Sequence, residues 1–204
     1  NTCGFIGDAK KEAIDTILEV CQLKDEGTVG AVVVTGCLAQ RYKDEIMNEI
    51  PEVDAVIGIG ANADIAAVCR DVLGSKKVNL FPPKLALPLE GGRVLTTPQH
   101  YAYLKIAEGC SNCCTYCAIP KIRGKFRSRQ MENIIAEAKS LAENGVKELI
   151  VVAQDTTKYG IDLYGELKLA TLLKELCKID GIEWIRTLYC YPESITDELI
   201  DVMA

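Results

Sequence analysis

The stretch 103–117, YLKIAEGCSNCCTYC, decides the fold of the second half of the chain. It begins as an apolar run typical of a buried β-strand and ends in a loop with four cysteines. Helical and strand-like stretches alternate after it, with helices expected over 130–144, 167–177 and 195–203 and strands over 148–153 and 182–188. Three successive βα units predict the first part of a (β/α) barrel, in which the active site lies at the carboxyl ends of the strands.

Residues 1–74 predict a second, smaller α/β unit. Strand-like runs alternate here with helical patterns, the strands at 29–35 and 53–57 and the helices at 9–23, 41–50 and 64–73. Apolar strands separated by helices indicate a parallel sheet covered on both faces, so we expect a small doubly wound domain. Residues 75–99 contain four prolines and Gly91-Gly92 and predict a linker, which leaves residues 100–204 for the partial barrel.

The composition argues against several classes of protein. A net charge of −6 gives no sign of a surface for a polyanion, so nucleic acid is not expected as a partner. No apolar run reaches the roughly 20 residues of a membrane span, and the first residues lack a signal-peptide pattern, so we expect a cytoplasmic protein without a membrane partner. Ten cysteines then favour metal or redox chemistry over disulfides. The start at Asn1 and the short barrel lead us to expect a chain truncated at both ends.

Three of the cysteines have the spacing of a catalytic iron–sulfur site. Cys110, Cys114 and Cys117 are separated by three and then two residues, on one loop that follows a predicted barrel strand. Three thiolates leave one iron of a four-iron cluster open, as a catalytic metal site requires, whereas four protein ligands close a structural site. The alternative is a zinc knuckle that also uses Cys113, although adjacent cysteines point apart and rarely serve one tetrahedral ion.

Two further cysteines belong to the amino-terminal unit. Cys37 directly follows a strand-like run, and Cys3 stands before a helix. We expect both at the carboxyl edge of the predicted sheet, where such folds bind ligands. On spacing alone, two ordinary buried thiols are an equally good interpretation.

The three-cysteine spacing resembles the radical S-adenosylmethionine (SAM) superfamily. The aromatic residue before the last cysteine, Tyr116, also fits that pattern, in which this position packs beside the adenine of SAM. The resemblance implies that the open iron binds the amino and carboxylate groups of SAM. It also implies that the reduced cluster cleaves SAM to a radical that abstracts hydrogen from an unactivated carbon.

Motifs along nearly the whole chain resemble the methylthiotransferase family. They are NTCGFI at 1–6, TGCLAQR at 35–41, the cysteine loop with IPKIRG at 119–124, and QDTTKYG at 154–160. Cys3 and Cys37 match two of the three cysteines that hold a second four-iron cluster in that family, and the first would lie upstream of Asn1. The continuation after Cys3, the QDTT stretch and LYCYP at 188–192 look like the RimO type.

This resemblance implies a transferase with two [4Fe-4S] clusters and SAM as cofactors, the auxiliary cluster lacking one ligand in this chain. The RimO type adds a methylthio group to the β-carbon of an aspartate in a small-subunit ribosomal protein. That protein and an electron donor such as flavodoxin are the expected partners. The alternatives are a MiaB-type enzyme that modifies isopentenyladenosine in transfer RNA, or a non-catalytic iron–sulfur or zinc protein. We expect the isolated fragment to be inactive.

Candidate SAM-binding residues other than Tyr116 lie at or near the ends of predicted barrel strands. Gln154 and Asp155 end the second strand, so their side chains can reach the mouth of the barrel, although a polar turn would explain them equally well. Arg186 alternates onto the barrel face of the third strand, where it would pair with a carboxylate, and a one-residue shift would make it a solvent charge. Arg127 and Arg129 precede a predicted helix and are expected to be solvated, with a ligand role as the alternative. No residue is assigned as catalytic beyond the cluster ligands.

Overall fold

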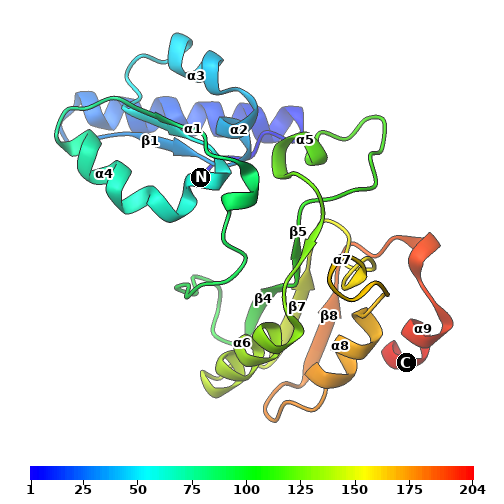
Figure 1. Cartoon of the computed structure of the whole chain (residues 1–204). Coiled ribbons are helices and arrows are strands. Elements are labelled where there is room, and N and C mark those ends of the chain that lie inside the picture. The colour runs from blue at the N-terminus through cyan, green and yellow to red at the C-terminus, as the bar shows by residue number, and fades with distance from the viewer. The chain divides into compact units, whose positions relative to one another are not determined.

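The computed structural model describes residues 1–204 and contains two parallel sheets of three strands each (Figure 1). The chain forms two compact units. One comprises Asn1–Pro88 together with Cys114–Gly124, and the other comprises Leu89–Cys113 together with Lys125–Ala204. Because the second unit resumes after residue 124, the loop that carries the cysteines is shared between the two units.

The first unit has a parallel sheet in the order β1-β2-β3, formed by β1 (Val33–Thr35), β2 (Ala55–Ile57) and β3 (Val78–Leu80). The helices of this unit are α1 (Gly7–Asp25), α2 (Cys37–Arg41), α3 (Lys43–Glu49), α4 (Ile65–Leu73) and α5 (Ile119–Arg123), with 3-10 turns at Ile59–Asp64 and Lys84–Ala86. Alternate strand residues belong to different cores: Val34 and Val56 pack with Ile17 of α1, and Ile57 packs with Val68 of α4. Helices therefore cover both faces of the sheet, as the doubly wound prediction requires.

The structure differs from the sequence prediction in three parts of this unit. The predicted linker at 75–99 begins with a strand, since β3 pairs in parallel with β2. The predicted helix at 41–50 is α3 at 43–49, and the sequence prediction missed the short helix α2 before it, which ends at Arg41 because Tyr42 has φ −126°. The strand predicted at 29–35 is shortened to β1, as residues 29–32 make no regular ladder.

The second unit has a parallel sheet in the order β4-β7-β8, formed by β4 (Tyr101–Lys105), β7 (Glu148–Val152) and β8 (Trp184–Thr187). The helices are α6 (Met131–Glu143), α7 (Ile161–Tyr164), α8 (Leu169–Leu176) and α9 (Asp197–Met203), with a 3-10 turn at Pro192–Ser194. A short antiparallel ladder joins β5 (Ala107–Glu108) to β6 (Arg127–Ser128). The element order gives three parallel βα units, which is the partial barrel that the sequence predicts.

One face of this second sheet forms the main hydrophobic core. Leu104 and Leu149 are fully buried and pack with Ile134 of α6 and Leu172 of α8. The opposite face carries side chains that remain partly or largely exposed, among them Tyr103, Trp184 and Arg186. Helices therefore cover one face only, as on the outside of a barrel. No helix of the structure combines the length and the apolar character that crossing a membrane would demand.

Candidate iron–sulfur and SAM site

The cysteine loop leaves the sheet of the second unit at the carboxyl end of its first strand. β4 leads into β5, and Gly109 follows with φ 76°, a left-handed conformation that glycine adopts without strain. Cys110 comes next and is 7% exposed, so its thiol lies among the side chains of the unit. The backbone amide of Phe126 donates to Ser111 Oγ at 3.1 Å, which ties the start of the loop to the segment that returns after residue 124.

A second contact ties the loop to the end of β7. Asn112 Nδ2 donates to Asp155 Oδ2 at 2.8 Å, and Asp155 is fully buried. The other carboxylate oxygen, Asp155 Oδ1, accepts from the Thr157 amide at 3.1 Å and from Thr157 Oγ1 at 2.5 Å. Both oxygens of Asp155 are thus occupied by the protein, one of them by the cysteine loop itself.

Cys114 and Cys117 lie in the part of the loop that packs with the amino-terminal unit. A turn joins the two cysteines, in which the Cys117 amide donates to the Cys114 carbonyl at 3.0 Å. The Ile119 amide points at Cys117 Sγ at 3.5 Å. Backbone N–H groups directed at sulfur stabilise a thiolate, as they do in iron–sulfur proteins. The donor set of this loop therefore fits an iron–sulfur cluster.

Cys113 differs from its neighbours in its backbone. It has φ 51° and an exposed side chain, whereas Cys114 is half-buried. None of the ten cysteines is in a disulfide. Within either unit, no group of three His, Cys, Asp or Glu side chains is placed to hold a metal ion, so ligation by Cys110, Cys114 and Cys117 stays a prediction.

The structure brings Cys3 and Cys37 to the same edge of the first sheet. A parallel bridge joins Thr2 to Gly36, in which the Thr2 amide donates to the Thr35 carbonyl at 2.8 Å and the Cys37 amide donates to the Thr2 carbonyl at 2.8 Å. Cys3 is exposed and Cys37 is half-buried. Cys3 and Cys37 each directly follow one of the two residues of this bridge.

The three remaining candidate SAM residues lie in different environments. Tyr116 is 86% exposed. Gln154 follows β7 and its Oε1 atom is buried without a hydrogen-bond partner. Arg186 lies on the helix-free face of the sheet and pairs with Glu148, Nε to Oε1 at 2.8 Å. Its partner Glu148 is the first residue of β7. Arg186 therefore points toward the amino end of the strands and away from the cysteine loop.

A cavity of about 340 Å³ lies beside the first part of the cysteine loop in the second unit. Its lining includes Cys110, Asn112, Asp155, Lys158 and Asp162. Asp162 is attached to β6: it accepts from the amide of Ser128 at 2.9 Å and from its hydroxyl at 2.6 Å. Two carboxylates thus border one cavity with different attachments.

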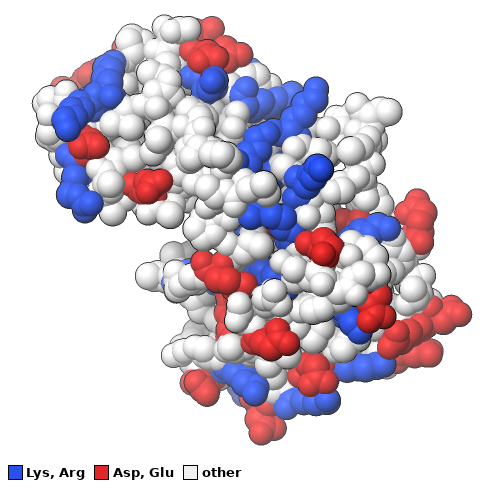
Figure 2. Space-filling view, in the orientation of Figure 1, with Lys and Arg blue, Asp and Glu red and all other residues white.

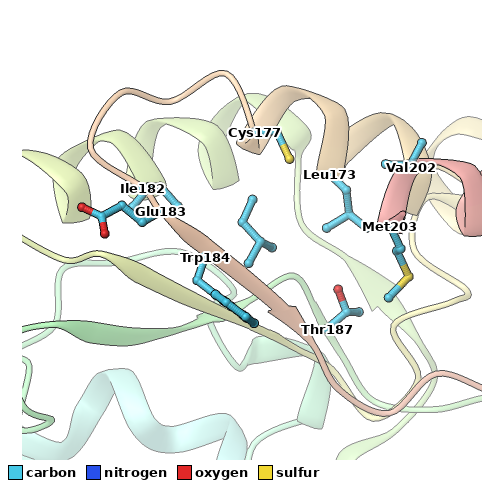
Figure 3. Close-up of a pocket in the computed structure, with 9 residues that line it drawn as sticks. Leu173, Cys177, Ile182, Glu183, Trp184, Thr187, Val202 and Met203 are labelled. Atoms are coloured by element: carbon cyan, nitrogen blue, oxygen red, sulfur yellow. The ribbon is translucent and has the colours of Figure 1, made fainter.

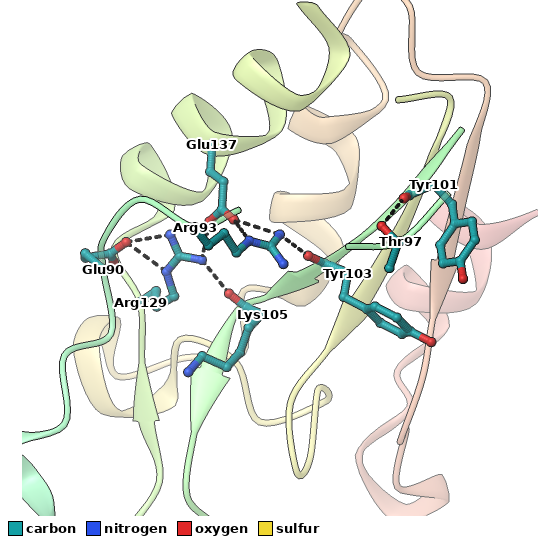
Figure 4. A network of polar contacts seen from close by, with 8 residues as sticks. All are labelled: Glu90, Arg93, Thr97, Tyr101, Tyr103, Lys105, Arg129 and Glu137. Carbon is teal, nitrogen blue, oxygen red and sulfur yellow. Dashed lines mark hydrogen bonds and ion pairs between the residues drawn. The ribbon is translucent and has the colours of Figure 1, made fainter. Parts of the chain in front are cut away.

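Arg129 is a further buried charge, and the expectation that it is solvated was wrong (Figure 4). It is 5% exposed and pairs with Glu137 at 2.7 Å and with Glu90, Nε to Oε2, at 2.9 Å. Burial lowers the pKa of the guanidinium, but the hydrogen bonds and charges of Glu90 and Glu137 outweigh it, so the pKa is raised above its ordinary value. Two carboxylates from distant segments explain the burial, which the sequence around Arg129 does not reveal.

Tyr159, which lies in the loop after β7, also contacts Arg129. Its hydroxyl donates to the Arg129 carbonyl at 3.0 Å, and the side chain is fully buried. Burial, with a smaller contribution from Tyr164, raises the pKa of Tyr159, so the hydroxyl stays protonated and remains a donor.

A second cavity of about 280 Å³ lies between α8, β8 and α9 (Figure 3). Leu173, Trp184, Val202 and Met203 are among the residues that line it. It contains no cysteine of the predicted cluster sites, and its only thiol is Cys177. No residue of the cysteine loop therefore lines this cavity.

Comparisons with known proteins agree with this geometry. Residues 1–58 match the model of Uncharacterized protein family UPF0004, and residues 104–204 match the Radical SAM superfamily. The chain is similar to proteins named Ribosomal protein uS12 methylthiotransferase RimO. It is 57% identical to the one of Clostridium tetani, 55% to that of Clostridioides difficile and 56% to that of Lachnoclostridium phytofermentans, each over all of this chain and 46% of the relative. The chain thus spans about half the length of these curated relatives.

Parallel βα units with a three-cysteine loop after the first strand define the class as radical SAM proteins, and the match over 104–204 agrees. The identities over the full length narrow the class further. The chain belongs to the RimO-type family of radical SAM methylthiotransferases.

Proposed function

We propose that the protein to which this chain belongs transfers a methylthio group to the β-carbon of an aspartate in a small-subunit ribosomal protein. The observation that carries the proposal is the cysteine loop at the carboxyl end of the first parallel strand, together with similarity, over the whole of this chain and 46% of the relatives, to proteins named for uS12 methylthiotransfer. Substrate and activity come from those names, and the loop supplies the site at which such chemistry would start.

Cys110, Cys114 and Cys117 are the proposed ligands of a [4Fe-4S] cluster that, with SAM bound, supplies the electron for reductive cleavage of SAM. The Ile119 amide would stabilise the Cys117 thiolate, and the burial of Cys110 would keep water from its sulfur. Cys3 and Cys37 are the proposed ligands of an auxiliary cluster, supported by the bridge that places them on adjoining strand ends.

Tyr116 and Gln154 are the proposed contacts to SAM among this chain's residues. The exposed ring of Tyr116 offers an apolar face on the cysteine loop, and the buried Oε1 of Gln154 is an acceptor without a partner. Arg186 is a weaker candidate because Glu148 already neutralises its charge. A flavodoxin-type electron donor and a cytoplasmic location complete the proposal, since the reaction needs a reductant and ribosomal substrates are cytoplasmic.

The proposal is tested by mass spectrometry on the full-length protein, loaded with iron and sulfide and given SAM and a reductant. We expect a methylthio group on an aspartate of uS12 and none on transfer RNA that carries isopentenyladenosine. Cys114→Ala should abolish the product, while Cys113→Ala should retain it, because Cys113 has a different backbone conformation and an exposed side chain. Modification of transfer RNA alone would replace the proposal with the MiaB-type activity.

The net charge of the chain, −6, does not point to nucleic acid as the substrate. Figure 2 shows a group of Lys and Arg side chains over part of the first unit, and Lys and Arg mixed with Asp and Glu over the second. Proteins that track a phosphate backbone usually present a surface of one sign. The net negative charge of the chain favours the protein substrate over the transfer-RNA substrate.

A further inference from the structure

The hydrogen bonds of Asp155 are those expected of a residue that holds the cysteine loop in place. A carboxylate that contacts SAM would need an oxygen directed at the ligand, yet Asp155 is fully buried and both of its oxygens accept hydrogen bonds from this chain. Thr157 fixes one oxygen and so sets the orientation of the other. That second oxygen meets Asn112, which lies between Cys110 and Cys113 on the loop.

We propose that Asp155 is a positioning residue that fixes the cysteine loop through Asn112 and thereby sets the place of Cys110. The proposal rests on the proposed function for its link to the iron–sulfur cluster, and it replaces a SAM-binding role for Asp155. Hydrogen bonds to a charged acceptor are stronger than those between neutral groups, and low local dielectric strengthens them further. A fully buried carboxylate at 2.8 Å from the loop amide is therefore a firm attachment point.

The segment after β7 is polar although it is buried, because its side chains make hydrogen bonds within the protein. Thr156 ties this segment to the next strand, since its hydroxyl donates to the Leu188 carbonyl at 2.7 Å and its amide donates to the Tyr189 carbonyl at 3.1 Å. Asp155 is thus held from the side of β8 as well as by Thr157. A carboxylate held in this way fixes the position of the cysteine loop relative to the ends of β7 and β8.

Asn112 donates the hydrogen bond and Asp155 accepts it, so exchanging the two residues tests the proposal. Asn112→Asp places a second carboxylate against Asp155, so like charges replace a hydrogen bond and push the loop away. Asp155→Asn in the same molecule restores a donor and an acceptor in the opposite direction, while the oxygen of the introduced amide can still accept from Thr157. The double variant therefore rescues the contact without restoring the native residues, which a general loss of packing would not allow.

The first readout is the rate at which iodoacetamide alkylates Cys110 in the cluster-free protein, followed by mass spectrometry, with exposed Cys113 on the same peptide as internal reference. Asn112→Asp should raise the Cys110 rate about tenfold or more, the size expected for losing a hydrogen bond to a charged group. The double variant should return to within about threefold of the native rate. Asp162→Asn is the matched control, because Asp162 lines the same cavity but binds Ser128, and it should leave the rate unchanged.

The second readout is the rate at which a chelator removes iron from the reconstituted protein. We expect about a tenfold increase for Asn112→Asp, in the range typical of residues that orient metal ligands, and recovery in the double variant. Unchanged alkylation in Asn112→Asp, or no recovery in a folded double variant, would overturn the positioning role. A native protein that binds no iron would instead remove the proposed function, and the alkylation series would still decide whether Asp155 fixes the loop.

Discussion

At the scale of residues, two neighbouring cysteines of one loop differ in backbone angle and in exposure. Cys113 has φ 51°, in a region that costs a non-glycine residue about 1 kcal/mol, and its side chain is exposed. Cys114 is half-buried and its carbonyl accepts the amide of Cys117. The half-buried position of Cys114 and the exposure of Cys113 are consistent with the proposal that Cys114, and not Cys113, is a cluster ligand.

Asp54 is the residue whose ionisation contributes to stability in the first unit. Its Oδ1 pairs with Lys24 at 2.7 Å and its Oδ2 accepts the Val32 amide at 2.8 Å. Burial raises the pKa of this carboxyl, but the bonds to Lys24 and Val32 outweigh it, so the pKa lies below its ordinary value. A carboxyl with a lowered folded pKa stabilises the protein above its unfolded pKa and loses that contribution as the pH falls through the folded value.

We therefore predict that Asp54→Asn flattens the acid limb of the stability profile. The free energy of unfolding, measured with urea from pH 7 downward, should fall less steeply in the variant below about pH 4, where the native carboxyl becomes protonated. Asp15→Asn, on the exposed side of α1, is the control and should follow the native profile. Parallel profiles for native protein and Asp54→Asn would contradict the assignment.

At the scale of elements, α6 and the residue Arg129 that precedes it are joined to the segment before β4 by the charged side chains of Figure 4. Glu137 of α6 pairs with both Arg129 and Arg93, each at 3.0 Å or less, and Glu90 completes the group. Arg129 also donates to the Lys105 carbonyl at 2.6 Å at the end of β4. Helix, strand and incoming segment are thus fixed by one side chain.

Removing that side chain should be costly. We predict that Arg129→Ala lowers the free energy of unfolding by about 3 kcal/mol, because it removes a buried guanidinium together with its hydrogen bonds to Glu90 and to the Lys105 carbonyl and its ion pair with Glu137. Arg186→Ala removes a partly exposed pair with Glu148 and should cost less than about 1 kcal/mol. Chemical denaturation of both variants checks the contrast, and equal losses would contradict the distinction between the two pairs.

The elements with a strong period could be predicted from the sequence, and those held by distant contacts could not. The apolar spacing of Ile134, Ala138 and Leu141 predicts α6 correctly, because packing on the sheet selects that face. α7 has four residues between Gly160 and Gly165, and the Asp162–Ser128 contact holds it from outside its own sequence. The same reason hides the Asn112–Asp155 contact: the loop and the strand end are adjacent only in the fold.

The spacing of the candidate thiols can be read from the sequence, whereas the contacts that hold the cysteine loop cannot. The spacing of Cys110, Cys114 and Cys117 is local, so the sequence shows it directly. The bridge beside Cys3 and Cys37 follows from parallel strands ending at one edge. Asp155 was expected to bind SAM because it ends a strand, and the structure instead engages both its oxygens within the protein.

At the scale of the whole molecule, the second sheet has an open edge. β8 pairs only with β7, and Trp184 on it is 62% exposed beside the cavity of Figure 3. Unpaired strand edges and exposed apolar side chains promote association between chains. We predict that the 204-residue chain forms dimers or larger species in analytical ultracentrifugation, and that Trp184→Lys shifts it toward the monomer. A monodisperse native monomer would contradict this prediction.

The central claim is that three thiols of one loop hold a SAM-binding iron–sulfur cluster. Its most direct test is electron paramagnetic resonance of the anaerobically reconstituted and reduced protein, with and without SAM, in the native form and in Cys114→Ala and Cys113→Ala. We predict a four-iron signal that changes on addition of SAM, is lost for the loop site in Cys114→Ala and persists in Cys113→Ala. A native signal indifferent to SAM, or one equivalent of zinc without iron and dependent on Cys113, would contradict the claim.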